Sequence, residues 1–157
     1  MGYTIREMHA DEYRLLEDFL YEAIFIPEGA EPPARDIIKL PDLQVYIKDF
    51  GTLPCDTAYA AFVDGRAVGA AWARIMHDYG HIDDETPSLA VALYKEYRGQ
   101  GIGTGLMSAL LSGLWDKGCR RTSLSVQKAN YAVKMYRKLG FVTVDENDEE
   151  YIMLKDL

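Results

Sequence analysis

Glycine occupies every second position from residue 99 to 105, in the run Arg98-Gly99-Gln100-Gly101-Ile102-Gly103-Thr104-Gly105. A strand-like segment, residues 88–93, precedes this run, and an apolar helical segment, residues 106–115, follows it. Bare backbone at the start of a helix lets several amide N–H groups point at one anion, and the helix dipole adds partial positive charge there. The alternative is a plain turn between strand and helix. Four alternating glycines are more than a turn needs, so the run predicts a phosphate-binding loop.

The spacing of these glycines excludes two common phosphate-binding motifs. A dinucleotide fingerprint needs G-x-G-x-x-G, but its last position falls on Thr104 or Leu106 in the two registers. A P-loop needs a lysine directly after its last glycine, and the first lysine after the run is Lys117. The pattern that fits is Arg/Gln-x-x-Gly-x-Gly, which begins at Arg98. In this pattern the chain resembles the GCN5-related N-acetyltransferase (GNAT) family, whose members hold the pyrophosphate of acetyl-coenzyme A (acetyl-CoA) in such a loop.

The resemblance implies a set of residues that bind acetyl-CoA as cosubstrate. The loop contributes Arg98, Gly99, Gln100, Gly101, Ile102, Gly103 and Thr104. In the family the fourth and fifth strands splay apart, and the exposed edge of the fourth strand pairs with the pantetheine arm. Here that edge is Val91, Ala92 and Leu93, whose amides would also bind the acetyl carbonyl as oxyanion donors.

One position departs from the family pattern. Many relatives carry an asparagine where this chain has Ala129, and Asn130 lies one position later. Such an offset rotates a side chain by about 100° around a helix. Asn130 is therefore either a coenzyme contact or a helix N-cap.

A second stretch, Ala132-x-x-x-Tyr136-x-x-x-Gly140-Phe141, supports the resemblance. It predicts a short helix that ends at a glycine and leads into a strand. In the family a helix of this form carries a tyrosine beside the coenzyme sulfur, so the resemblance implies that Tyr136 is the catalytic general acid. Taken alone, Tyr136 would be interpreted as a core residue and Gly140 as an ordinary residue after a helix end. The resemblance covers residues 57–154 in motif order.

Length and composition, with 48% hydrophobic residues, are typical of one well-buried domain, so the resemblance implies a single N-acetyltransferase domain over residues 1–157. The formal net charge of −8 argues against nucleic acid as a partner, since phosphate backbones need clustered Lys and Arg. Cys55 and Cys119 make no disulfide framework, and no Cys/His spacing suits zinc, so no metal is expected. The sequence has no run long enough to span a membrane and no signal-type core, which predicts a cytoplasmic protein with no membrane partner.

The hydrophobic pattern predicts the order strand, two helices, three strands, helix, strand, helix and two strands. The strands are expected over residues 3–8, 58–63, 67–77, 88–93, 122–126, 142–144 and 151–154, and the helices over 12–24, 41–50, the segment after the glycines and 132–140. Asp64-Gly65 is a strong hairpin signal. This order predicts a mixed α/β fold, with a mostly antiparallel central sheet flanked by helices, rather than a doubly wound parallel sheet.

The group that deprotonates the acceptor is left open by the sequence. Free alkylamines have a pKa of about 10.4, so a proton must leave before attack, through a carboxylate or through water. Some relatives place a glutamate at the start of the fourth strand, near the position of Pro87 here. The candidates nearby or on the first helix are Glu22, His77, His81, Asp83, Asp84 and Glu85. Each is equally explained as a solvated charge or a structural histidine.

Two mechanisms and three functional classes follow from the sequence. A covalent acetyl-cysteine is disfavoured because neither Cys55 nor Cys119 has a histidine in local reach to lower its pKa. We therefore expect direct transfer, in a ternary complex, to a primary amine on a small molecule or peptide. The acidic segment 76–86 would attract a cationic amine. A non-catalytic acyl-CoA sensor and a plain interaction domain stay open, and so does a homodimer formed through the C-terminal hairpin.

Overall fold

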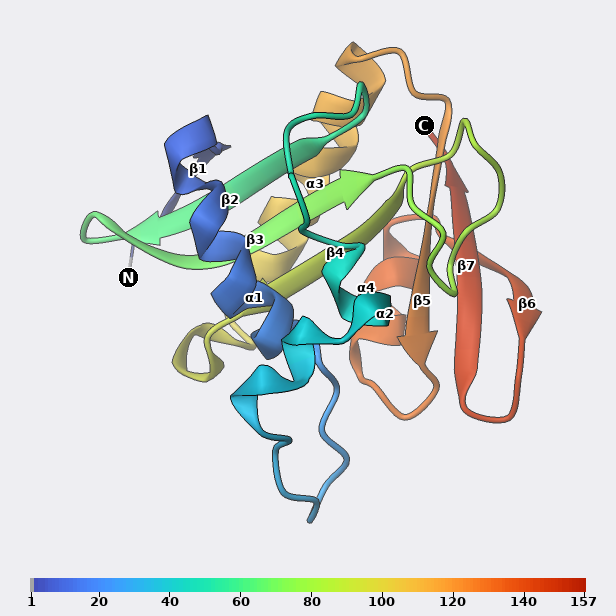
Figure 1. The fold of residues 1–157 in the computed structure, drawn as a ribbon, viewed down its shortest axis with the longest axis horizontal. Coiled ribbons are helices and arrows are strands. Elements are labelled where there is room, and N and C mark those ends of the chain that lie inside the picture. The colour runs from blue at the N-terminus through green and yellow to red at the C-terminus, as the bar shows by residue number, and fades with distance from the viewer. Residues whose placement is uncertain (1) are drawn as a thin grey trace.

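A computed structural model describes residues 2–157, which form one seven-stranded sheet with helices on both faces (Figure 1). The strands lie in the order β1-β2-β3-β4-β5-β7-β6. Their bounds are β1 Thr4–Glu7, β2 Thr57–Val63, β3 Arg66–Arg74, β4 Ser88–Leu93, β5 Arg121–Gln127, β6 Val142–Glu146 and β7 Glu150–Asp156. Neighbouring strands are antiparallel except β4 and β5, which are parallel. The mixed, mostly antiparallel α/β fold expected from the sequence is confirmed.

The parallel contact between β4 and β5 is confined to the start of β4. Among residues 2–157, the two strands are in register only at Ser88 and Ser123. From there β4 follows β3 as far as Leu93, whereas β5 follows β7 along its whole length. The two strands therefore diverge, and the edge of β4 that faces β5 has no sheet partner in the described chain beyond this point. The splay implied by the family resemblance is present.

Helices cover the two faces of the sheet in pairs. The 3₁₀ segments are η1 Ala10–Leu15, η2 Arg35–Lys39 and η3 Lys95–Tyr97, and the α-helices are α1 Leu16–Ala23, α2 Pro41–Gln44, α3 Ile102–Asp116 and α4 Ala132–Lys138. Helices α1 and α2 lie on one face and α3 and α4 on the other (Figure 1). Across residues 2–157, every helix is too short or too polar to cross a bilayer.

The central strands β2 and β3 pack small side chains against both helical layers. Because successive side chains of a strand point to opposite faces, Ala61 and Ala71 belong to the core under α3, while Ala60 and Trp72 belong to the core under α1. Trp72 is fully buried and fills the second core. These small side chains let a helical layer pack closely against each face of the sheet.

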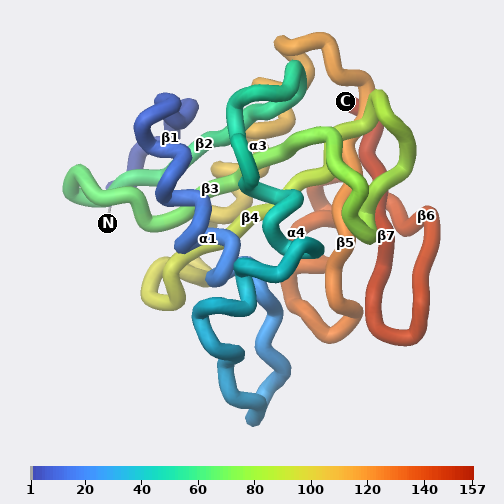
Figure 2. The backbone as a smooth tube through the Cα atoms, viewed as in Figure 1, coloured from blue at the N-terminus to red at the C-terminus, as the bar shows by residue number. Residues whose placement is uncertain are grey.

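The helix expected over residues 41–50 is wrong beyond its first turn, since α2 ends at Gln44. The buried Arg74 side chain of β3 donates hydrogen bonds to the carbonyl oxygens of Val45 and Lys48, at 3.2 and 2.7 Å. These carbonyls would otherwise accept the next bonds of a continuing helix. A tertiary contact therefore stops α2, and the chain continues through turns that Figure 2 shows as the teal segment crossing in front of the sheet.

Two other element bounds differ from those expected. The helix expected over residues 12–24 begins as η1 and becomes α-helical only at Leu16. The strand expected to run to His77 ends at Arg74, because Arg74 is opposite Ser88, the first residue of β4. The Asp64-Gly65 hairpin is confirmed, with both residues at positive φ as a type I′ turn requires.

A buried ion pair between Asp56 and Arg74 attaches the loop that precedes β2 to the end of β3. The Arg74 guanidinium contacts both carboxylate oxygens of Asp56, at 3.1 and 2.9 Å, and the two side chains are 5% and 1% exposed. The same carboxylate accepts the backbone N–H groups of Gly51 and Leu53. Each charge is therefore fully compensated, and the removal of either partner leaves an unpaired buried charge.

We predict that Asp56→Ala lowers the free energy of unfolding by about 3–5 kcal/mol, because Arg74 then stays buried without a counter-ion. Urea denaturation monitored by circular dichroism measures the loss. The matched control is Glu12→Ala, which breaks the exposed ion pair with Arg6 and should change the midpoint far less. Equal losses in the two variants would contradict the assignment of this pair as the main buried electrostatic contact.

Candidate active site

The glycine run forms a loop whose backbone leads directly into α3. Gly99 and Gly101 have φ values of +74° and +84°, a left-handed conformation that side chains rarely adopt. Gly101 is the N-cap of α3, and the first backbone bond of the helix runs from Gly105 N–H to the Gly101 carbonyl at 3.2 Å. The amides of residues 102–104 therefore face outward at the positive end of the helix dipole. Such an arrangement binds an anion.

The other two glycines of the run lie where α3 packs against its neighbours. A Cβ on Gly105 would lie 2.9 Å from the Ile5 side chain, so this glycine lets α3 approach β1. A Cβ on Gly103 would lie 3.6 Å from Met135 Sδ and 3.7 Å from Leu93 Cδ1. The start of α3, the helix α4 and the end of β4 therefore meet at Gly103.

The polar side chains of the loop are bonded to the protein itself. Arg98 Nε donates to the Leu93 carbonyl at 3.0 Å, and its terminal nitrogen lies 3.3 Å from the Glu22 carbonyl and 3.7 Å from the Glu22 carboxylate. Gln100 donates to the Glu96 carbonyl at 3.0 Å. Ile102 is buried in the core and Thr104 is exposed. Arg98 thus ties the loop to the end of β4 and to α1, while the amides of the helix start stay outward.

The helix α4 ends in a Schellman motif that holds Tyr136 in place. The Phe141 N–H bonds to the Tyr136 carbonyl and the Gly140 N–H to the Arg137 carbonyl, both at 3.0 Å, with Gly140 at φ +101°. The rings of Tyr136 and Phe141 pack edge to face at 5.9 Å. The glycine is thus the ordinary helix-ending residue that the sequence also allowed, and it orients the tyrosine.

Tyr136 is 7% exposed, and burial raises the pKa of its phenol above the usual value. Within residues 2–157 its hydroxyl makes no hydrogen bond, and no fully buried polar side-chain atom lacks a partner. The hydroxyl therefore keeps an opening to the surface beside a buried ring. A protonated phenol with a free donor can give a proton to a bound group.

Comparison with known proteins bears on this arrangement. The model of the acetyltransferase (GNAT) family matches residues 11–141. The chain belongs to this family. Its class is that of an acetyl-CoA-dependent acyltransferase. An N-alpha-acetyltransferase of Saccharolobus solfataricus is 28% identical over 128 residues, covering 71% of this chain and 74% of that protein. An aminoglycoside N(6′)-acetyltransferase of Salmonella typhimurium is 30% identical over 88 residues, covering 54% and 61%.

A solved structure shares the fold of this GNAT protein along its whole length. The PaiA N-acetyltransferase of Thermoplasma acidophilum, crystallised in complex with coenzyme A, superimposes with a TM-score of 0.72 over 100% of both chains. Its sequence identity to the present chain is 21%. At this level of identity the likeness concerns the fold.

Asn130 has a structural role in this acetyltransferase. Its Oδ1 accepts the Ala132 N–H at 2.9 Å, so the side chain satisfies an amide at the start of α4. The N-cap of α4 itself is Tyr131, so Asn130 bonds to the helix start from one position before the cap. A contact between Asn130 and the coenzyme stays a prediction.

The expected base candidates fall into two groups in the structure. Glu22 and Asp83 are engaged in ion pairs, with Arg98 and Arg121 respectively. Hydrogen bonds from the Glu85 N–H and the Thr86 hydroxyl hold the pKa of Asp83 below its usual value. The exposed or loop-facing candidates are His77, His81, Asp84 and Glu85. None of the described contacts brings one of these residues to β4.

Asp78 is a site residue that sequence reasoning missed. Its carboxylate accepts the Ser88 hydroxyl at 2.8 Å and the Tyr46 hydroxyl at 3.0 Å. Because Ser88 pairs with Ser123, the carboxylate lies where β4 and β5 begin to diverge. The sequence showed only an aspartate at the head of an acidic loop, and no local signal marks its distant partners.

The two cysteines lie together, away from the glycine loop. Cys55 and Cys119 are free thiols with their sulfurs 3.6 Å apart. Burial, followed by the contact with Cys55, raises the pKa of Cys119 to about 11. A thiol with this pKa is almost entirely protonated at neutral pH and is a poor nucleophile.

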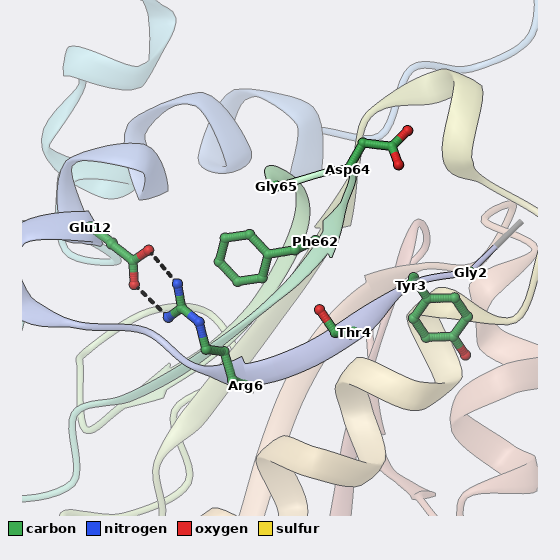
Figure 3. Close-up of a pocket in the computed structure, with 8 residues that line it drawn as sticks. All are labelled: Gly2, Tyr3, Thr4, Arg6, Glu12, Phe62, Asp64 and Gly65. Carbon is green, nitrogen blue, oxygen red and sulfur yellow. Dashed lines mark hydrogen bonds and ion pairs between the residues drawn. The ribbon is translucent and has the colours of Figure 1, made fainter.

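A separate hollow of about 560 Å³ opens beside β1 and the β2–β3 turn (Figure 3). Its floor includes the Arg6–Glu12 ion pair and the ring of Phe62, over which the Arg6 guanidinium lies at 4.3 Å. Arg6 and Glu12 compensate each other, and Asp64 adds a negative charge to the lining. It is distinct from the place where α3, α4 and β4 meet, and it offers no group for acyl transfer.

We predict opposite effects of an added methyl group at two neighbouring glycines. Gly101→Ala should lower the free energy of unfolding by about 1 kcal/mol, because alanine is strained at φ +84°. Gly103→Ala should leave it unchanged or raise it by up to about 1 kcal/mol, since its Cβ would make ordinary contacts and alanine favours a helix. Chemical denaturation of both variants measures the difference. Destabilisation of the same size at both positions would contradict this account of the loop.

Proposed function

We propose that this protein is a single-domain N-acetyltransferase that transfers the acetyl group of acetyl-CoA directly to a primary amine in a ternary complex. The observation that carries the proposal is the meeting of three features at Gly103. These features are the outward amides at the start of α3, the end of the splayed strand β4, and α4 with its tyrosine. An anion site, a strand edge and a proton donor are the parts that a bound thioester requires.

Coenzyme binding is assigned to the main chain around the glycine loop. The amides of residues 102–104 hold the pyrophosphate, and the left-handed Gly99 and Gly101 keep the approach free of side chains. The β5-facing edge of Val91–Leu93 pairs with the amides of the pantetheine arm. Arg98 and Gln100 act mainly by holding this loop, since both side chains are already bonded to carbonyls. Asn130 lies at the start of α4 as a further contact.

The transfer step is direct attack of the amine nitrogen on the acetyl carbonyl carbon. The new C–N bond forms, the C–S bond breaks, and the thiolate of coenzyme A takes the proton of Tyr136, which is restored from solvent. Burial raises the pKa of this phenol, so Tyr136 is protonated at neutral pH and gives up its proton only as negative charge develops on the adjacent sulfur. Amides at the edge of β4 stabilise the negative charge that develops on the carbonyl oxygen.

Asp78 is proposed as the group that receives the proton of the acceptor amine, through water. Its carboxylate lies beside Ser88. Some relatives have a glutamate one position earlier, where this chain has Pro87. Both oxygens of Asp78 accept one hydrogen bond each, which fixes their direction and leaves lone pairs free. The cysteines take no part in this scheme, since the raised pKa of Cys119 keeps its side chain in the thiol form at neutral pH.

The acceptor class follows from charge. The loop between β3 and β4 carries four acidic residues, Asp78, Asp83, Asp84 and Glu85, which favours a cationic amine. Curated relatives are named for acetylation of aminoglycosides and of an alanine of ribosomal protein bS18, so small molecules and peptides are both acceptors to test. A homodimer through the exposed edge strand β6 is part of the proposal.

The decisive experiment has two stages. Thermal shift with acetyl-CoA tests binding, and release of free thiol from acetyl-CoA across a panel of amines, aminoglycosides and peptides tests transfer. We expect both to be positive. Binding without thiol release on any amine would favour an acyl-CoA sensor, and absence of binding would favour an interaction domain.

Tyr136→Phe is predicted to lower kcat by about 10- to 100-fold, because the thiolate must then leave without a proton donor. Calorimetry should show the dissociation constant of acetyl-CoA within about twofold of the parent, since the ring is kept. Tyr131→Phe is the matched control, as that side chain is 70% exposed beside the same helix. Unchanged turnover in Tyr136→Phe would remove the general-acid assignment.

Asp78→Asn is predicted to reduce kcat/KM by about 100-fold at neutral pH and to recover activity as the pH approaches the pKa of the amine, where free amine needs no base. Glu85→Gln, an exposed change in the same loop, is the control. Tyr46→Phe keeps the carboxylate and removes only one of its donors, so it separates proton transfer from loop structure. A loss in Asp78→Asn that is independent of pH would assign the residue to structure alone.

A further inference from the structure

The loop between β3 and β4, residues 75–87, brings two histidines and an aspartate together at the surface. His77 Nε2 lies 3.7 Å and His81 Nε2 lies 3.4 Å from the same oxygen, Asp84 Oδ1. The three donor atoms all lie within 4.8 Å of one another. This cluster is distinct from the glycine loop and from Tyr136, and the proposed transfer step does not use it.

The distances in this cluster suit a shared ion better than direct hydrogen bonds. A hydrogen bond between an imidazole and a carboxylate has a heavy-atom distance of about 2.7–2.9 Å. Two ligands that lie about 2.0–2.1 Å from one tetrahedral metal ion are instead about 3.3–3.4 Å apart. The measured separations of 3.4 and 3.7 Å are therefore close to the edge of a metal coordination tetrahedron.

His81 is already oriented as a ligand. Its Nδ1 lies 2.9 Å from the Met76 carbonyl oxygen, so Nδ1 carries a proton and Nε2 is the nitrogen that faces Asp84 and is placed to bind an ion. A histidine whose second nitrogen bonds to a backbone carbonyl is the usual arrangement at metal sites. The His81 side chain is 20% exposed, whereas those of His77 and Asp84 are each 81% exposed. One ligand is thus fixed, and the other two are free to close on an ion.

We propose that His77, His81 and Asp84 bind a divalent first-row transition metal of the Zn²⁺, Co²⁺ or Ni²⁺ type. Two imidazoles and one carboxylate match the donor preference of these ions, while Mg²⁺ and Ca²⁺ require oxygen ligands. Water completes the coordination shell. The acidic residues of the same loop add to the attraction for a cation.

Binding would join the two ends of the loop, because His77 lies near its start and Asp84 near its end. The loop also contacts β5 and the β6–β7 turn, through the Gly80 carbonyl bonded to the Ser123 hydroxyl and the Tyr79 hydroxyl bonded to Asn147. Figure 1 shows it beside β5 and β7. An ion here would therefore make the loop more rigid and raise the melting temperature of the whole chain.

The chain supplies its own control for this proposal. His9, Asp11 and Glu12 form a second cluster with similar spacing. There the Glu12 carboxylate is committed to both terminal nitrogens of Arg6, at 2.8 and 2.9 Å, and this contact lowers the pKa of Glu12 to about 2. A metal ion would have to break that ion pair. We therefore expect no tight binding at His9.

The test is isothermal titration of ZnCl₂ and NiCl₂ into the metal-free full-length chain carrying Cys55→Ser and Cys119→Ser, which removes thiol ligands. We expect one equivalent to bind, with affinity at least about tenfold weaker in His77→Gln, His81→Gln and Asp84→Asn. His9→Gln should bind like the parent. NMR of the ring nitrogens should show metal-induced shifts at Nε2 of His81 while Nδ1 keeps its proton.

Absence of binding up to millimolar metal would overturn the proposal. Equal affinity in His9→Gln and His77→Gln, or loss only in His9→Gln, would also overturn it. All of these readouts are independent of acetyl transfer. A failure of the proposed function therefore leaves this test intact.

Discussion

The short parallel contact between β4 and β5 is the constraint from which the site follows. Ser88 pairs with Ser123, and then β4 stays with β3 while β5 stays with β7. A sheet with continuous pairing would satisfy the backbone of β4 on both sides and leave no edge for a ligand. The divergence instead leaves main-chain groups of β4 facing a gap, directly beside the outward amides of α3. The proposed binding surface is thus made of backbone, and its shape is set by the strand partners.

Buried polar side chains from the middle of the sheet hold the loops around this gap. Arg74 takes the carbonyls of Val45 and Lys48 and pairs with Asp56, which ends α2 and fixes the chain that leads into β2. Tyr46, held within that same turn, reaches Asp78. The carboxylate at the root of the splay is therefore positioned by a chain of contacts that begins in the core. Disruption of Arg74 would be felt both in stability and in the geometry of the site.

Features encoded by neighbouring residues could be predicted from the sequence, and features encoded by distant contacts could not. The glycine loop, the Asp64-Gly65 turn and the helix ending at Gly140 need φ values or periodicities that are visible locally. The early end of α2, the position of Asp78 and the pairing of the two cysteines depend on side chains more than 25 residues away. The histidine cluster has the i, i+4, i+7 spacing of a helix face, but residues 77–84 form a loop. Its members meet through the path of that loop, which no local pattern predicts.

The charge of the chain gives a further reason for a site built from main chain. The protein carries a formal charge of −8, whereas the pyrophosphate of a coenzyme is itself anionic. A cluster of lysines and arginines would attract the pyrophosphate, but it would attract other anions as well. The cation of the loop, Arg98, is already paired with Glu22 and bonded to the end of β4. The helix amides and dipole then supply the positive potential without a free side-chain charge. In the proposed reaction the acidic β3–β4 loop attracts a cationic acceptor, while main-chain amides rather than exposed basic side chains hold the coenzyme.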